Sequence, residues 1–278
     1  MAYGTVVADV VQSSVTGVSL GAGNATLLKN RLIDAGFTIN QRVYVSGTAL
    51  SAGTYAHDRW KAGASGCTYT FTQGSLGVPI VITITAGSLQ QIIEGCNMPD
   101  GGTFTLSWTG TAQGRVNGGS YGSSPLAVTG LTAGANCTVE FNTGTLSFPQ
   151  LEVGSSATGY EYRQYGQELA LCQRYCQVNR AGVNGSGIAA GIWFTSGGPL
   201  FSYQFIVPFR ATPTMTYSAL SDFAVVGSGT AAGPSSLTIS GTCTTTTRID
   251  AAATGTAGQG SILQTTGSSS VLTFSAEL

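Results

Sequence analysis

The clearest shortage in this 278-residue sequence is of charged side chains, which make up only 8% of its residues. Ordinary globular chains carry about 25%. The 11 Lys and Arg and the 12 Asp and Glu give a net charge of −1. Lys29 and Arg31 come close together, but no longer basic cluster follows, whereas a nucleic-acid-binding surface needs many basic groups to neutralise phosphates. The composition therefore argues against nucleic acid as a partner.

Long hydrophobic runs are missing as well. A membrane-spanning helix needs about 20 apolar residues in a row, and the longest candidate, Val78–Ile84, contains Pro79 and is followed by Thr85. The first Lys is Lys29, so no positively charged start precedes an apolar stretch as it does in a secretion signal. We therefore expect no membrane insertion and no secretion, and a reducing cytosol as the compartment where the chain is made.

The six cysteines form no CxxC motif. The two that lie closest together in the sequence, Cys172 and Cys176, have no second pair of possible metal ligands nearby. We expect free thiols in a reducing compartment, and neither a zinc site nor any other metal or cofactor. Two of the cysteines alternate with apolar residues and are predicted to be small buried hydrophobes. These two are Cys67 and Cys137. The other four are Cys96, Cys172, Cys176 and Cys243.

What the sequence does have is 42% hydrophobic residues, arranged mainly with a period of two. Phe104, Leu106 and Trp108 alternate with polar residues, and Leu272 and Phe274 do so near the end of the chain. Such alternation, in Thr-rich stretches separated by Gly, Ser and Asn, is typical of antiparallel strands. The sequence therefore predicts an all-β fold with two β-rich domains.

Two segments depart from that rhythm and are predicted to be helical. Ser88–Glu94 begins with a capping residue, places Leu89, Ile92 and Ile93 on one helical face, and is followed by Gly95. Gly166–Gln177 spaces apolar residues as a helix does, with an acidic residue near its start and a basic one near its end.

The expected domain organisation has four parts. Residues 1–29, with a single charge among the first 24, form an extended N-terminal arm that packs on something else. Residues 30–164 form the first β domain, and residues 165–180 form a short helical linker. Residues 181–278 form a second, C-terminal β-rich domain.

Three stretches resemble one protein family. They are KNRLIDAGFTINQR (Lys29–Arg42), YAHDRW (Tyr55–Trp60) and the long block from Phe148 to Gln177, which contains QLE, ATGYEYR and GQELALCQRY. Together with the opening MAYGT and the closing FSAEL, they are similar to a widespread group of tailed-phage virion proteins: tail-fibre, adhesion and head-fibre proteins. The middle of each domain resembles that group only in pattern.

The resemblance implies a carbohydrate-binding-like jelly-roll first domain, a β-sandwich knob and a homotrimer. It also implies residence in the virion after assembly in the host cytoplasm, with residues 1–29 attached to other virion proteins and a host-surface glycan as a possible ligand. The low charge is compatible with surfaces covered by neighbouring copies, since interface cores are depleted in charge. A monomeric Thr- and Ser-rich secreted sandwich is the alternative explanation of that composition.

Catalytic patterns are weak, and we expect no enzyme and no catalytic residue. The only histidine, His57, is followed at once by Asp58, which on a strand would point to the other face rather than orient the imidazole. We expect both to form a polar edge beside a buried Trp60. The carboxylates are scattered singly, with no pair typical of a glycosidase.

Binding residues are the remaining candidates. Trp60 and Trp108 are in apolar phase and are predicted to be core residues. Trp193 faces away from Ile192 and Phe194, so it is expected to pack in a subunit interface or to stack on a ligand. Tyr121, in the turn-rich sequence GGSYGSS, is a second ligand-binding candidate. Asp100, in an MPDGG turn, supplies too few ligands for calcium by itself.

These observations favour a non-enzymatic fibre or adhesion subunit of a virion. A capsid-decorating or head-fibre protein with a stabilising role is the first alternative. A polysaccharide-degrading hydrolase is the second.

Overall fold

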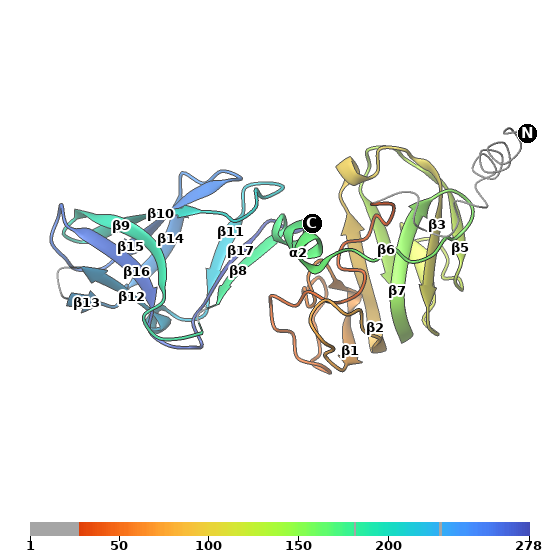
Figure 1. Cartoon of the computed structure of the whole chain (residues 1–278), viewed down its shortest axis with the longest axis horizontal. Helices are drawn as coiled ribbons and strands as arrows, with labels where there is room; N and C mark the ends of the chain where they lie inside the picture. The colour runs from red at the N-terminus through yellow and green to blue at the C-terminus, as the bar shows by residue number, and fades with distance from the viewer. Residues whose placement is uncertain (1–27, 181, 228–229) are drawn as a thin grey trace, which may run out of the picture. The chain divides into compact units, whose positions relative to one another are not determined.

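The computed structural model describes residues 28–180, 182–227 and 230–278 (Figure 1). The predicted arm therefore lies outside the described residues except for its last two. The chain divides by its contacts into two compact units, Met1–Leu169 with Leu278, and Ala170–Glu277. Both units are built from antiparallel strands, and the described residues contain one short α-helix. The predicted all-β fold with two sandwich-like domains is confirmed.

The first unit has one curled seven-stranded sheet. The hydrogen-bonded order is β4-β6-β2-β7-β3-β5, and β1 pairs with β2. The long strand β2 pairs with β7 only through Ile82–Ile84, so the sheet folds over at this point and encloses a core. The strands are β1 (Lys61–Phe71), β2 (Ile82–Ile93), β3 (Gly102–Thr109), β4 (Gly114–Val116), β5 (Leu126–Leu131), β6 (Cys137–Phe141) and β7 (Gly144–Val153).

The core of this unit contains the alternating residues that the sequence indicated. Trp60 and Trp108 are buried, as predicted, and Cys67 and Cys137 are buried free thiols. The segment before β1 is irregular and contributes residues to the core, among them Leu32 and Phe37. A side-chain amide on β2 holds this segment in place. The buried Gln91 accepts a hydrogen bond from the Ile33 N–H and donates one to the Ile33 carbonyl, each at 2.7 Å.

The helix predicted for Ser88–Glu94 is wrong, because these residues form the second half of β2 down to Ile93. Leu89, Gln91 and Ile93 face the core with a period of two. The hydrophobic residue that a strand pattern requires at position 91 is replaced by glutamine, whose amide is satisfied by backbone groups. Pairing with β6 thus outweighs the local helical spacing.

The second predicted helix exists but is shorter. Helix α2 spans Tyr165–Gln173, and strand β8 (Cys176–Arg180) follows it. The expected end at Gln177 is wrong because Cys176 and Gln177 pair with Ser275 and Phe274 in a small sheet. The border between the two contact units, after Leu169, lies within α2.

The second unit contains two antiparallel sheets (Figure 1). A seven-stranded sheet has the order β13-β12-β16-β9-β10-β15-β14, and a three-stranded sheet has the order β11-β17-β8. Aromatic residues contributed by both sheets and by loops form the core, among them Phe201, Phe223 and Phe274. The remaining strands are β9 (Gly187–Thr195), β10 (Gly198–Gln204), β11 (Thr214–Tyr217), β12 (Phe223–Gly227), β13 (Thr230–Ala232), β14 (Ser236–Ser240), β15 (Thr246–Ala252), β16 (Gly260–Thr265) and β17 (Val271–Ser275).

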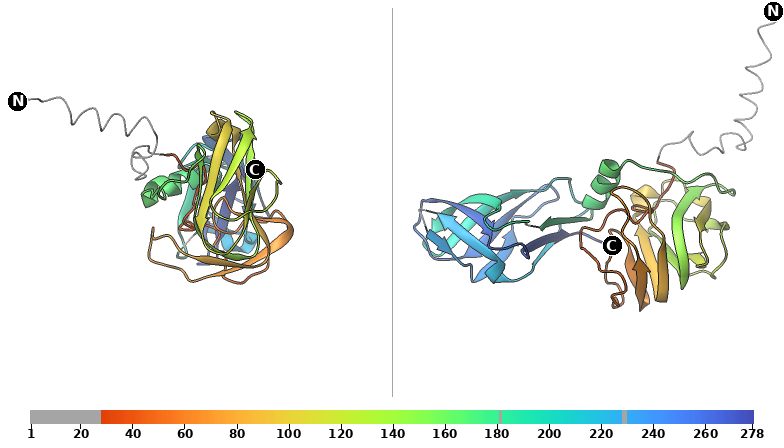
Figure 2. Two further views of the ribbon diagram at one scale, coloured as in Figure 1. Left: turned by 90° about the vertical axis from the view of Figure 1, so that its right-hand side faces the viewer. Right: turned by 60° about the horizontal axis from the view of Figure 1, so that its bottom comes forward.

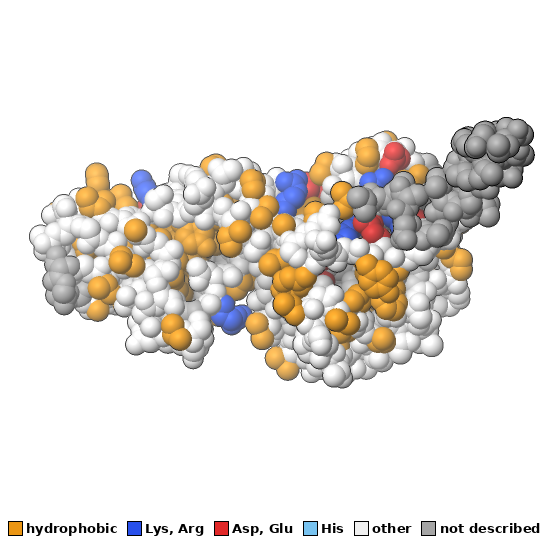
Figure 3. Space-filling model, viewed as in Figure 1, with side chains coloured by type: hydrophobic (Ala, Val, Ile, Leu, Met, Phe, Trp, Pro, Cys, Tyr) orange, Lys and Arg blue, Asp and Glu red, His pale blue; other side chains and the backbone are white. Residues whose placement is uncertain are grey.

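Each unit can be followed from further directions in Figure 2. The surface seen in Figure 3 is mostly neutral and polar, with scattered hydrophobic side chains and few charged ones. No helix in the described ranges is long and apolar enough to cross a membrane.

Candidate functional site

A hollow of about 240 Å³ opens in the first unit against β3, β7 and the segment 154–164 that follows β7. Ser107 on β3 and Gln150 on β7 are paired in register, and both belong to its lining. None of the described residues around this hollow is charged. They are Ser107, Trp108, Thr109, Phe148, Gln150, Ala157, Thr158, Tyr160 and Tyr162. We call this feature the aromatic hollow.

Three aromatic rings form one wall of the aromatic hollow. The ring centres of Phe148 and Tyr160 are 5.0 Å apart, those of Tyr160 and Tyr162 are 4.9 Å apart, and both pairs meet edge to face. Tyr162 is 70% exposed, so most of its ring is available to a ligand. Phe148 has a φ of 54°, a left-handed conformation that is rare for a bulky residue and is often found where function requires it.

Polar side chains below the rings are mostly committed to one another. The buried Gln150 amide donates to Glu152 at 2.9 Å and accepts from the Glu161 N–H at 2.9 Å. Thr158 donates to Glu152 through both its N–H and its hydroxyl. These bonds fix the segment that carries the two tyrosines against β7.

Four hydroxyl groups of the lining remain for a ligand. The side chains of Ser107, Thr109, Tyr160 and Tyr162 make no hydrogen bond to any described residue, and all four line the hollow. Burial raises the pKa of Tyr160, so this phenol stays protonated at all ordinary pH values. The aromatic hollow therefore offers neutral hydroxyl donors and acceptors beside electron-rich ring faces.

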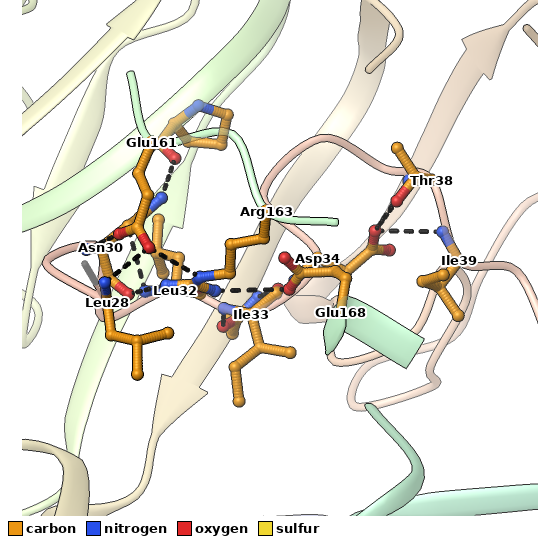
Figure 4. Close-up of polar contacts among 12 residues, drawn as sticks. Leu28, Asn30, Leu32, Ile33, Asp34, Thr38, Ile39, Glu161, Arg163 and Glu168 are labelled. Carbon is orange, nitrogen blue, oxygen red and sulfur yellow. Dashed lines mark hydrogen bonds and ion pairs between the residues drawn. The ribbon is translucent and has the colours of Figure 1, made fainter. Parts of the chain in front are cut away.

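A buried ionic network is centred on Arg163, the residue that follows Tyr162 in the chain (Figure 4). The Arg163 guanidinium contacts the carboxylates of Glu161 at 3.2 Å and Glu168 at 3.4 Å. It also donates to the carbonyl of Leu32 at 2.9 Å and to that of Asn30. Arg163 thus joins the segment after β7 to the irregular segment that begins the unit.

The start of the described chain is bound to the same wall. Glu161 accepts hydrogen bonds from the backbone N–H groups of Leu28 at 2.8 Å and Asn30 at 2.7 Å (Figure 4). The Lys29 ammonium donates to Thr158 and to the Gly159 carbonyl, and lies 3.9 Å from Glu152. The charges around the aromatic hollow are therefore paired behind its lining.

Two carboxyl groups of this region titrate abnormally. Burial, with the nearby charges of Asp58 and Glu168, raises the pKa of Asp34 well above its ordinary value, although Thr38 and Ile39 donate to one of its oxygens. Burial also raises the pKa of Glu168, against the opposing effect of Arg163. Both groups hold segments in place, and neither lines the aromatic hollow.

The structure places His57 and Asp58 in the interior rather than at a polar edge. Both are fully buried, so the expected edge is wrong, while the burial of Trp60 beside them is confirmed. The His57 Nδ1 lies 2.7 Å from the Tyr69 hydroxyl, and burial lowers the pKa of His57 to about 4. The Asp58 carboxylate accepts from Gln41 and contacts Arg42 at 3.2 Å.

Neither of the residues predicted to bind ligand belongs to the lining of the aromatic hollow. Tyr121 is half-buried, and the Arg115 guanidinium lies 4.4 Å from its ring centre. Arg115 is itself paired with Glu140 at 2.7 Å.

Trp193 was expected at a subunit interface or on a ligand, and this placement needs correction. It is only 3% exposed and belongs to the core of the second unit, where Gly255 packs against its indole. The predicted alternation of β9 is present, but the exposed side carries Ile192 and Phe194.

The aromatic hollow was not predicted from the sequence, although two of its rings lie in the motif ATGYEYR. Tyr160 and Tyr162 stand two apart in GYEYR, a spacing that puts two rings on one side of an extended segment. That signal was available. The contribution of Phe148 was not, because its left-handed backbone breaks the alternation of β7.

Metal binding has little support in the described part of the chain. Asp100, the calcium candidate, forms an ion pair with Arg31 at 2.7 Å. No group of three or more His, Cys, Asp or Glu that could hold a metal ion occurs among the described residues.

Comparisons with known proteins add no identification. No protein-family model matches this chain, and a search of curated proteins found no match.

Proposed function

We propose that this protein is a non-enzymatic structural subunit of a tailed-phage virion, a fibre or adhesion protein that contacts host-surface glycan through the aromatic hollow. The observation that carries the proposal is the wall formed by Phe148, Tyr160 and Tyr162 next to free hydroxyl groups. Aromatic faces beside hydroxyls are suited to sugar rings, which have an apolar side and a polar rim.

The placement on a virion rests on the resemblance of the three sequence blocks. Residues of the first and third blocks form the buried network around Arg163. Two of the stretches that carry the resemblance therefore also hold the wall of the proposed site in place. In this proposal residues 1–29 attach a homotrimer to the particle. The low charge of the chain supports close association between copies.

The test is adsorption of particles that carry Tyr162→Ala. This side chain is 70% exposed and makes no hydrogen bond to a described residue, so its loss leaves folding and incorporation intact. We expect normal amounts of the protein per particle and adsorption to host cells at least tenfold slower. Phe194→Ala is the matched control, since Phe194 is 71% exposed on the other unit.

Two outcomes contradict the proposal. Normal adsorption of Tyr162→Ala particles combined with fragile heads on removal of the protein would indicate a decorating role. Loss of polysaccharide viscosity on incubation with the purified chain would indicate a hydrolase.

A further inference from the structure

We infer that the aromatic hollow selects a single uncharged sugar ring and discriminates against sugars that carry a carboxylate, phosphate or amine. The inference rests on the proposed glycan-binding function and specifies the ligand class. It follows from the size of the hollow, from its lining and from where the nearby charges lie.

The size of the hollow limits the ligand to about one ring. Pockets for drug-sized molecules measure roughly 300–1,000 Å³, and the aromatic hollow measures about 240 Å³. An extended peptide, including a proline-rich one, would need a longer groove of aromatic residues. The rings of Phe148, Tyr160 and Tyr162 form instead one compact cluster with centres 4.9 to 6.1 Å apart.

The lining supplies no counter-charge to a ligand. Two charged groups bound to the lining residue Thr158, those of Lys29 and Glu152, have side chains only 9% and 4% exposed. Their polar atoms are bound to Thr158 and its neighbours. A charged sugar entering the hollow would lose water without gaining an ionic partner, which is costly.

Arg163 and Glu161 are equally unavailable to a ligand. Their side chains are 6% and 8% exposed, and they are paired with each other and with backbone groups of the first segment. An anionic ligand could recruit Arg163 only by breaking its contacts with Glu161, Glu168 and the Leu32 carbonyl. Among the described residues of the lining, the unused groups are neutral: the hydroxyls of Ser107, Thr109, Tyr160 and Tyr162.

The experiment measures binding of the purified full chain to an array of bacterial surface glycans. Selected ligands are then titrated as methyl glycosides at 50 and 500 mM NaCl. Neutral probes are the methyl glycosides of glucose, galactose, mannose and N-acetylglucosamine. Charged probes are those of glucuronic acid, glucosamine and N-acetylneuraminic acid, and a polyproline peptide is included as a different class of ligand.

We expect at least one neutral glycan to bind, with less than a twofold change in Kd between the two salt concentrations. Charged sugars should bind at least tenfold more weakly. Tyr162→Ala should weaken neutral binding at least tenfold, and Phe194→Ala should leave it within twofold.

The failures are distinguishable. Charged sugars that bind as tightly as neutral ones, and lose affinity on Tyr162→Ala, would overturn the ligand class and leave the proposed function standing. Binding of the polyproline peptide in place of glycans would overturn both. Glycan binding that survives Tyr162→Ala would move the site elsewhere and overturn this inference. The absence of any glycan binding would contradict the proposed function itself.

Discussion

Both units bury a hydrophobic core with antiparallel sheets, but different kinds of side chain stabilise them. Residues 28–169 contain seven of the 11 Lys and Arg and eight of the 12 Asp and Glu of the chain. Many of these are buried, and they pin irregular segments through groups such as Arg163, Asp58 and Glu152. The described second unit relies mainly on an aromatic core and on Ser and Thr hydroxyls.

The difference shows where a β protein needs ionic groups. Strands satisfy their own backbone groups through the ladder, whereas irregular segments require partners from side chains. The first unit has more than thirty residues of irregular chain before β1, and the buried amides of Gln91 and Gln150 bind the backbone of two irregular segments. This arrangement makes the first unit more sensitive to loss of a charge or to pH.

The largest effect expected from this contrast is that of Arg163→Met. Removal of the guanidinium leaves Glu161 and Glu168 buried without their partner, and breaking a buried pair costs about 3–5 kcal/mol. We expect the first unit to lose stability by that amount, measured by urea denaturation with hydrogen exchange of peptides from β6.

The matched control for Arg163 is Arg248→Met in the second unit. The Arg248 side chain is 52% exposed and is paired with Asp250 at 2.6 Å. Exposed pairs contribute little to stability, so little change is expected in peptides from β16. Equal losses in the two variants would show that burial of the network does not matter.

The second effect is a loss of stability between pH 6.5 and 4 that originates from His57 in the first unit. Burial lowers the pKa of His57 to about 4 from an ordinary value near 6.5, so the unfolded chain takes up a proton first as the pH falls. The free energy of unfolding is unaffected by His57 above pH 6.5. It falls progressively between pH 6.5 and about pH 4, by about 3 kcal/mol in total.

His57→Gln isolates this contribution. The raised pKa values of Asp34 and Glu168 act in the opposite sense, because their stabilising protonated forms are lost as the pH rises. The difference between wild type and variant across pH 6.5 to 4 therefore reports the histidine alone. If the slope of stability against pH is the same in the variant and in the wild type, folding does not lower the pKa of His57, and this prediction is wrong.

The smallest of these effects concerns the aromatic packing of the second unit. A methyl group at Gly255 would meet the Trp193 ring at 2.3 Å, so Gly255→Ala should destabilise this unit by about 1–3 kcal/mol through overpacking. Gly197→Ala is the control, since nothing lies within 4 Å of its added methyl group. Thermal unfolding and the Trp193 fluorescence measure the effect, and equal behaviour of both variants would contradict the packing.

Much of the fold could be predicted from the sequence because the period of two is strong. Phe104, Leu106 and Trp108 face the core in β3, and Leu272 and Phe274 do so in β17. Where the pattern is broken, local reasoning failed. In Ser88–Glu94 the polar Gln91 occupies a core position and hides the alternation of a strand. Its amide is satisfied there by Ile33, which is 58 positions away in the sequence.

The candidate site was harder to predict for a similar reason. The aromatic hollow combines β3, β7 and the following segment, and the sequence shows only two of its rings together, Tyr160 and Tyr162. Trp193 was a misleading candidate because alternation tells which residues share a side of β9, and not which side faces the core. Exposed and buried sides of a strand with apolar residues on both look alike in sequence.

Glu161 receives the backbone of Leu28 and Asn30 on its carboxylate, and its neighbour in the chain is the exposed Tyr162. If the proposed glycan site is correct, a mechanical load on the residues upstream reaches, through this carboxylate, the residue next to a ring that contacts the sugar. Lys29 and Arg163 share the load, because they join the same two segments through Thr158, Gly159 and the Asn30 carbonyl. A particle held by such a contact would then release its ligand at a rate that depends on force.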